Sequence, residues 1–229
     1  MYNMVKELKG EAGLIDAHTS APDRVFSYPF VDSMYHSESA ATHKGMVITP
    51  EMYRLYFTKQ SLGTRGELIV YIRGGNAEKQ IRKMLALTLL HREIYRPMTN
   101  RYEYPSLQGY KEAAVVRLWN VFQRNKVDEA QWLPYWENKD YITIANGTEE
   151  TLASLWRHDD RLLVVVSNLS KEARELTITL KGKCQGFKNA FDAELYKTKQ
   201  HRKSRVQLRK NQLTIKLNAE DYKIIEITR

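Results

Sequence analysis

Two acids and two histidines lie close together near the start of the chain, and side chains of these types can perform acid–base chemistry. They are Asp16, His18, His36 and Glu38, within the stretch GLIDAHTSAPDRVFSYPFVDSMYHSES of residues 13–39. A pair of carboxylates can serve as proton donor and as base or nucleophile, and imidazoles can bind or orient hydroxyl groups. Because the acids follow short apolar runs, we expect strands to deliver them.

Strand-like and helix-like segments alternate over residues 1–131 and would position these side chains. The run Gly13–Ile15 predicts a short buried strand, and a second strand is expected near Phe30–Met34. The segment GELIVYIRGG predicts a third buried strand, and residues 76–97, NAEKQIRKMLALTLLHREIYRP, predict a long helix. Strand, tight turn and helix form half of a βαβ unit. Further helices are expected from Pro50 and over residues 110–125.

The pattern changes after Trp132 to short strands separated by polar turns. Eight strand-like runs follow one another at intervals near ten residues, with clear alternation of apolar and polar residues in ELTITL and QLTIKL. This spacing predicts an antiparallel β-sandwich over residues 132–229. The expected fold class is therefore α/β followed by all-β.

Several segments resemble bacterial glycoside hydrolases. RLLVVVSNLSKEARELTITL and LNAEDYKIIEITR resemble strands of the C-terminal sandwich of these enzymes, and WLPYWENKDYI resembles the passage from their catalytic barrel to that sandwich. The stretch of residues 13–39 is similar to the late strands of a (β/α)₈ glycosidase barrel of the α-galactosidase-like clan. The resemblance implies a partial (β/α)₈-type barrel segment over residues 1–131 and a C-terminal antiparallel β-sandwich over residues 132–229.

The same resemblance implies a catalytic site. Residues just past the carboxyl ends of barrel strands face the substrate, so we expect Glu38 first and Asp16 second as catalytic carboxylates. His18 and His36 would bind or orient sugar hydroxyl groups, and Arg73 would come from the third strand. A carboxyl separation of about 5 Å predicts retention at the sugar and roughly 6.5–9.5 Å predicts inversion. An Asp after a strand can also simply cap a turn.

The chain is short for a complete barrel. A (β/α)₈ barrel takes about 250 residues, whereas 131 residues precede Trp132 and contain roughly three predicted strands. We therefore expect the C-terminal portion of a glycoside hydrolase that hydrolyses glycosidic bonds with paired carboxylates. As this fragment alone it is expected to be inactive, and to pair with a missing N-terminal half or to self-associate.

One other interpretation of these residues remains open, and a metal site is not favoured. The chain could be a non-catalytic carbohydrate-binding or structural module, since Trp119, Trp132, Tyr135 and Trp136 could stack on sugars or pack in a seam between domains. The spacing of His18, His36 and Glu38 matches no compact metal-ligand pattern. No metal or other cofactor is therefore expected.

Composition argues against several other classes. The net charge is +9, and residues 196–210 hold seven Lys or Arg with no acid, but one aromatic and no recognisable motif favour a solvated hairpin over nucleic-acid binding. No run of 18 apolar residues predicts a membrane span. The single cysteine, Cys184, forbids an internal disulfide. The first 20 residues lack the apolar core of a secretion signal, so a periplasmic or secreted location would need a signal upstream of Met1.

Overall fold

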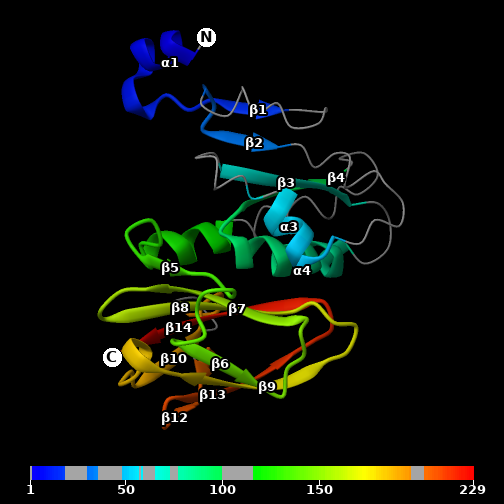
Figure 1. The fold of residues 1–229 in the computed structure, drawn as a ribbon, viewed down its shortest axis with the longest axis vertical. Coiled ribbons are helices and arrows are strands. Elements are labelled where there is room, and N and C mark those ends of the chain that lie inside the picture. The colour runs from blue at the N-terminus through cyan, green and yellow to red at the C-terminus, as the bar shows by residue number, and fades with distance from the viewer. Residues whose placement is uncertain are drawn as a thin grey trace. The chain divides into compact units, whose positions relative to one another are not determined.

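The computed structural model describes residues 2–18, 30–35, 48–56, 58, 65–72, 77–99, 116–196 and 204–229. The chain divides into two compact units that do not follow its linear order (Figure 1). The first unit holds the described residues up to Ala77 and those of β4, whereas Glu78–Leu90 belong to the second unit with the described residues from 116 onward. The division predicted between residues 131 and 132 stays a prediction about domains.

The first unit is built on a four-stranded parallel sheet. Its order is β1-β2-β3-β4, and each neighbouring pair is parallel. The strands are β1 Asp16–His18, β2 Ser33–Tyr35, β3 Arg65–Ile72 and β4 Ile94–Thr99. The helices that begin before β4 are α1 Tyr2–Lys9, η1 Gly10–Ala12, α3 Pro50–Tyr56, α4 Ala77–Thr88 and η4 Leu89–His91. Parallel neighbours need crossover connections, and in chain order α3 lies between β2 and β3 and α4 lies between β3 and β4.

The first strand lies later in the chain than predicted. The sequence predicts a strand over Gly13–Ile15, with Asp16 past its end, but the structure forms β1 from Asp16–His18. The backbone of Ile15 is engaged elsewhere: its N–H donates to Asp32 Oδ2 at 2.8 Å, and its carbonyl accepts from the Asp32 N–H at 2.9 Å. The ladder with β2 therefore starts one residue further along, so the predicted strand was wrong.

The long predicted helix over residues 76–97 was also wrong at its C-terminal end. In the structure α4 ends at Thr88, and residues 94–99 form β4. Arg92 has a φ of 59°, in the left-handed region that ends helices. Pro97 would remove a hydrogen bond inside a helix, and β4 is an edge strand of the described sheet, where proline is tolerated.

The second unit contains two antiparallel sheets that share one apolar core. Their orders are β11-β10-β14-β8-β7-β5 and β12-β13-β9-β6. Side chains of both sheets contribute to the core, among them Val164 and Ile225 from the first sheet and Ile178 and Ile215 from the second. The strands are β5 Gln131–Leu133, β6 Ile142–Ala145, β7 Thr151–Arg157, β8 Arg161–Asn168, β9 Arg174–Leu180, β10 Asn189–Asp192, β11 Arg205–Val206, β12 Leu208–Arg209, β13 Gln212–Leu217 and β14 Asp221–Thr228. Each of the eight runs predicted after Trp132 contains a strand.

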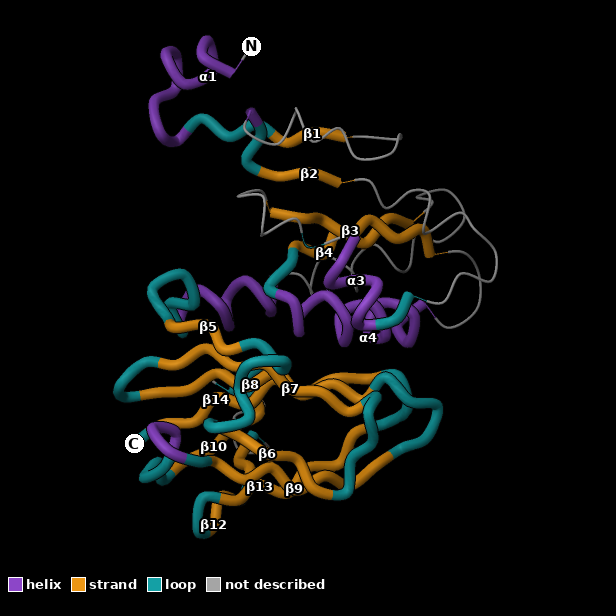
Figure 2. The backbone as a smooth tube through the Cα atoms, viewed as in Figure 1, coloured by secondary structure: helices purple, strands orange, loops and turns teal. Residues whose placement is uncertain are grey.

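The sheet of β7, β8 and β14 is covered on its outer face by helices. Strand β8 is buried at every position after Arg161, whereas β13 alternates between exposed and buried residues. On that face Ser167 Oγ donates to the Ala86 carbonyl of α4 at 2.7 Å, and the Phe122 and Trp156 rings lie 5.6 Å apart. Phe122 belongs to a helix over residues 116–124. Figure 2 shows α4 next to β7 and β8. The continuous apolar run of β8 thus reflects burial on both faces.

Polar contacts fix α4 to this sheet. Arg82 of α4 lies with its guanidinium carbon 4.4 Å from the centre of the Tyr222 ring, and Arg82 Nη2 donates to the Tyr222 carbonyl at 2.8 Å. The same guanidinium pairs with Asp221, and Lys83 pairs with Glu220 in the turn before β14. A helix that directly follows β3 in the chain is therefore an integral part of the second unit.

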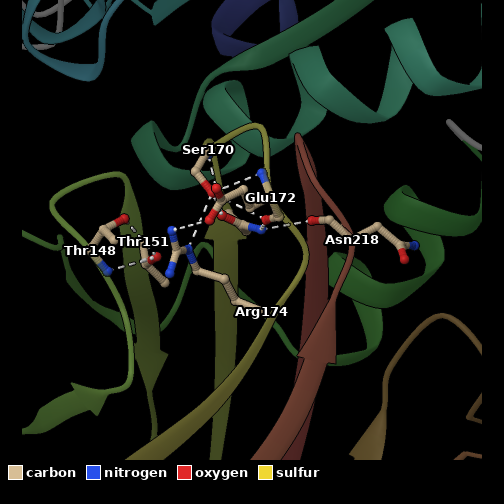
Figure 3. A network of polar contacts seen from close by, with 7 residues as sticks. Thr148, Thr151, Ser170, Glu172, Arg174 and Asn218 are labelled. Carbon is tan, nitrogen blue, oxygen red and sulfur yellow. Dashed lines mark hydrogen bonds and ion pairs between the residues drawn. The ribbon is translucent and has the colours of Figure 1, made fainter.

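A polar network around a buried asparagine ties two turns of the second unit together; Figure 3 labels Ser170, Glu172 and Asn218 among its members. Asn168, fully buried at the end of β8, donates from Nδ2 to the Glu172 carbonyl at 2.7 Å and to the Asn218 carbonyl at 2.9 Å. Its Oδ1 accepts from the Ser170 hydroxyl at 2.7 Å. The side chain therefore links the β8–β9 turn to the β13–β14 turn. Asn168, the asparagine of the VVVSNLS segment, therefore stabilises the two turns.

We expect Asn168→Ala to lower the free energy of unfolding by roughly 3 kcal/mol, because buried carbonyl and hydroxyl groups lose their partner and cannot reach water. Urea unfolding followed by circular dichroism measures this change. Asn189→Ala is the matched control, since Asn189 Nδ2 donates at 3.3 Å to the Arg229 carbonyl at the exposed end of the chain. Its expected cost is below about 1 kcal/mol. Equal costs for the two variants would contradict the linking role of Asn168.

Candidate functional site

Two of the five predicted site residues lie within the described part of the chain. Asp16 is the first residue of β1, and His18 is the last residue of that strand. His36, Glu38 and Arg73 lie outside the described residues. Their places in the chain still relate them to described strands, because His36 directly follows Tyr35 at the end of β2 and Arg73 directly follows Ile72 at the end of β3.

One face of β1 and β2 is polar and exposed. Asp16 pairs in register with Ser33, and the Ser33 hydroxyl donates to Asp16 Oδ1 at 2.8 Å. Met34, whose side chain points to the opposite face because strand residues alternate, is only 1% exposed. Over β1 and β2 the sheet therefore has a covered face at Met34 and a polar face on which Asp16 and Ser33 lie together.

The ends of β1 and β2 lie next to each other. His18 and Tyr35, the last residues of the two strands, are register partners. Strand β3 continues from Glu67, the partner of Tyr35, for five more residues to Ile72, or about 16 Å at 3.3 Å per residue. The strand ends that precede His36 and Arg73 therefore lie at different levels of the sheet.

Asp16 is level with the first residue of β3, because Asp16 and Arg65 are both partners of Ser33. The sequence predicts Asp16 just past the carboxyl end of a strand, but the structure places it at the start of β1. Since β1 has only three residues, Asp16 still lies about 7 Å before the end of its own strand.

A second carboxylate, Asp32, was not singled out from the sequence. Its Oδ2 accepts the Ile15 N–H at 2.8 Å, and its Oδ1 lies 3.4 Å from Lys6 Nζ of α1. Lys6 Nζ also donates to the Gly13 carbonyl at 2.7 Å. Nothing in the residue pattern marks Asp32, because both partners are distant in the chain. These contacts hold α1, the start of β1 and the start of β2 together.

We expect Asp32→Ala to lower stability by roughly 1–2 kcal/mol, because the half-buried Ile15 N–H and Lys6 ammonium both lose an acceptor. Thermal unfolding measures the loss. Glu51→Ala, in the exposed first turn of α3, is the control and should change stability by less than about 0.5 kcal/mol. An unchanged transition in Asp32→Ala would show that these contacts do not stabilise the fold.

A buried aromatic and ionisable group precedes β4. Tyr53 and His91 are fully buried with ring centroids 4.7 Å apart, and Glu93 is 6% exposed. Burial raises the pKa of the Tyr53 hydroxyl well above its usual value, and the nearby Glu93 charge raises it further. His91 and Glu93 lie just before the first residue of β4, at the amino end of that strand. We interpret this group as part of the packing.

The aromatic residues around β5 pack on one another. The Trp136 ring meets Trp132 edge-on at 5.6 Å and Tyr135 edge-on at 4.7 Å, and all three are half-buried. Trp119, in the helix over 116–124, is 65% exposed and is the most exposed tryptophan among the described residues.

The described ranges hold neither a metal-ligand cluster nor a membrane-spanning helix. No cluster of three or more His, Cys, Asp or Glu residues there could hold a metal ion. No helix in the same ranges has the length and apolar character needed to cross a membrane.

Comparison with known proteins shows similarity in fold and none in sequence. No protein-family model and no curated protein sequence matches the chain. Several solved glycoside hydrolases share its fold from end to end. A maltogenic α-amylase from Thermotoga neapolitana matches 100% of the chain with a TM-score of 0.59 and 11% identity, and an α-amylase from Geobacillus thermoleovorans, complexed with acarbose, matches 100% with 0.63 and 10%. A GH27 β-L-arabinopyranosidase from Geobacillus stearothermophilus, complexed with arabinose, matches 100% with 0.55 and 12%.

The chain therefore has a glycoside-hydrolase-like fold, which confirms the resemblance found in the sequence. It covers only 58%, 56% and 54% of these three solved chains, respectively. The chain thus spans about half the length of the enzymes whose fold it shares.

Proposed function

We propose that the chain is the C-terminal portion of a glycoside hydrolase that cleaves glycosidic bonds with two carboxylates. The four parallel strands would be the late strands of a (β/α)₈ barrel, and the two antiparallel sheets a C-terminal β-sandwich. The observation that carries this proposal is the end-to-end match to glycoside hydrolases of about twice the length. A barrel needs eight strands, so activity is expected only in a form that contains all of them.

Within this site we propose Glu38 as the first catalytic carboxylate and Asp16 as the second. The adjacent ends of β1 and β2 support the pairing, because Glu38 follows the end of β2 by three residues and Asp16 precedes the end of β1 by two. His18 and His36 belong to the same two strand ends and would bind sugar hydroxyl groups. Arg73, which follows the last residue of the longer strand β3 in the chain, would contact a more distant part of the substrate.

The proposed ligand is a carbohydrate. Two of the similar enzymes were solved with a carbohydrate-type ligand, acarbose in one and arabinose in the other. Two carboxylates suffice for acid–base hydrolysis of a glycoside, so the proposed reaction calls on no cofactor.

The test begins with the intact mass of the native polypeptide in its source cells, detected with an antibody against the second unit. We expect a species of about 46–50 kDa, because a 26.8 kDa chain spans 54–58% of the similar enzymes. That species should release nitrophenol from a nitrophenyl glycoside panel. A native species of 26.8 kDa that quenches tryptophan fluorescence with sugars and releases no product would replace this proposal with a non-catalytic binding module.

A further inference from the structure

One exposed turn of the second unit carries a residue pair that can modify itself chemically. The pair is Asn146-Gly147, the only Asn-Gly pair of the sequence, and it directly follows β6. Residues 146–150 lead from the sheet that contains β6 to the sheet that contains β7. All five residues are exposed, so water can reach the reacting groups.

An asparagine side chain can react with the backbone of the residue that follows it. Here the Gly147 nitrogen is the nucleophile, and it would form a bond to Asn146 Cγ. The attacking nitrogen loses its proton, and the side-chain nitrogen takes up a proton and leaves as ammonia. The product is a five-membered succinimide ring. Water then adds to one of the two ring carbonyl groups and reopens the ring as aspartate or as isoaspartate.

The reacting groups of this pair are not held by hydrogen bonds. Within the described part of the chain, no group accepts from the Gly147 N–H, and none bonds to the Asn146 side chain. Glycine also has no Cβ that would obstruct the attack. The contacts that order the turn lie beyond the pair, because the Thr148 N–H donates to Thr151 Oγ1 at 3.2 Å (Figure 3).

A second asparagine has the same backbone conformation but is held in place. Asn146 and Asn211 have φ values of 62° and 63°, in the left-handed region that asparagine tolerates. Asn211 Oδ1 accepts from the Gly186 N–H at 3.1 Å, and the Asn211 carbonyl accepts from the Leu180 N–H at 2.8 Å. The residue that follows is Gln212, which has a side chain. Asn211 is therefore an internal comparison for Asn146.

We propose that Asn146 is a site of self-modification, at which the chain deamidates to a mixture of aspartate and isoaspartate. The reaction consumes only water and releases ammonia. It uses no residue of the proposed catalytic site, so it does not depend on the proposed glycosidase activity.

Both products would change the turn between the two sheets. A carboxylate at position 146 shares this short turn with the exposed Glu149 and Glu150, and like charges repel. Isoaspartate also inserts one carbon into the main chain. The space there is tight, because a Cβ added to Gly147 would lie 3.1 Å from Thr151 Cβ and 3.3 Å from Ile144 Cγ2. Since Ile144 packs against the core, we expect isoaspartate to loosen the connection between the sheets.

The test incubates the purified chain at mildly alkaline pH and follows the peptides that contain Asn146 and Asn211 by mass spectrometry. A methyltransferase specific for isoaspartyl groups, with labelled S-adenosylmethionine, gives a second readout. We expect deamidation at Asn146 to be about 10- to 100-fold faster than at Asn211, because Asn211 must first break two hydrogen bonds. Asn146→Gly suits the left-handed conformation and should abolish the methyl incorporation that arises at this turn.

Equal rates at the two asparagines, no change of mass at Asn146, or undiminished methyl incorporation in Asn146→Gly would each overturn the proposal. Ion-exchange chromatography of the aged protein then isolates the isoaspartyl form. It should unfold at a lower temperature than freshly purified Asn146→Asp, which carries the new charge without the extra carbon. Equal midpoints would overturn the expected loosening of the connection between the sheets.

Discussion

A chain cut to residues 132–229 is expected to lose its cooperative fold. The truncation removes α4 and the helix over 116–124, which cover the outer face of the sheet formed by β7, β8 and β14. Trp156, Leu163 and Ile224 on that face are no more than 2% exposed in the intact chain. Exposing one such side chain to water lowers the free energy of unfolding by about 1.5–3 kcal/mol. The exposure of several such side chains therefore costs as much as the whole free energy of unfolding of a typical domain, about 5–15 kcal/mol.

The fragment should bind the dye ANS, lose its near-ultraviolet circular dichroism and aggregate on concentration. Two changes to the fragment should reverse part of this loss. Restoring residues 116–131 should recover part of the stability, because Arg124 then pairs again with the buried Glu226 at 2.9 Å. Replacing Leu163, Val165 and Ile224 by threonine in the short fragment should improve its solubility. A cooperative urea transition of the unmodified fragment equal to that of the intact chain would contradict the prediction.

This expectation bears on the rival interpretation of the second unit. A free-standing carbohydrate-binding module would fold without the helices of the α/β part, since such a module moves as one body on a linker. The hydrogen bond from Ser154 Oγ to the Leu90 carbonyl at 2.8 Å, and that from Ser167 to Ala86, instead attach the strands to the chain that follows α4 and to α4 itself. Loss of folding in the fragment would therefore exclude a free-standing binding module made of residues 132–229 alone.

The strands of the second unit could be predicted because one of its sheets faces water. In β13 each exposed residue is followed by a buried one, so QLTIKL shows a period of two. The run RLLVVVSN has no such period, since helices bury its outer face, and sequence alone does not reveal what covers a continuous apolar run. Its strand character came from length and β-branched residues.

The first unit was harder to predict for local reasons. Strands of three residues, such as β1, are too short to show a period, and their start depends on distant partners such as Asp32. Strand β4 was missed because IYRPMT contains a proline and directly follows a helix. The candidate site could be predicted only as a set of residue types after apolar runs, because the distance between Asp16 and Glu38 depends on residues outside the described part of the chain.

Replacing Glu38 by glutamine is expected to lower the turnover of the full-length enzyme by about 10²–10⁴-fold, the usual contribution of a general acid or base. Glutamine keeps the shape of the side chain but can neither give nor take the proton. Turnover of a nitrophenyl glycoside measures the loss, with folding checked by circular dichroism. Glu149→Gln, in the exposed turn before β7, is the matched control and should keep full turnover. Wild-type turnover in Glu38→Gln would remove Glu38 from the site.

The leaving group of the substrate then distinguishes the two carboxylates. If Glu38 is the proton donor, Glu38→Gln should lose much less rate on a dinitrophenyl glycoside, because that leaving group departs without protonation. Asp16→Asn should lose rate equally on both substrates if Asp16 is the nucleophile or base. Asp16 lies at the start of β1 and accepts a hydrogen bond from Ser33 at its Oδ1, so it could also have a purely structural role. The Asp16→Asn variant therefore tests the proposed site more strictly than Glu38→Gln does. Full turnover in Asp16→Asn would assign Asp16 to the structure of the sheet and require a different second carboxylate.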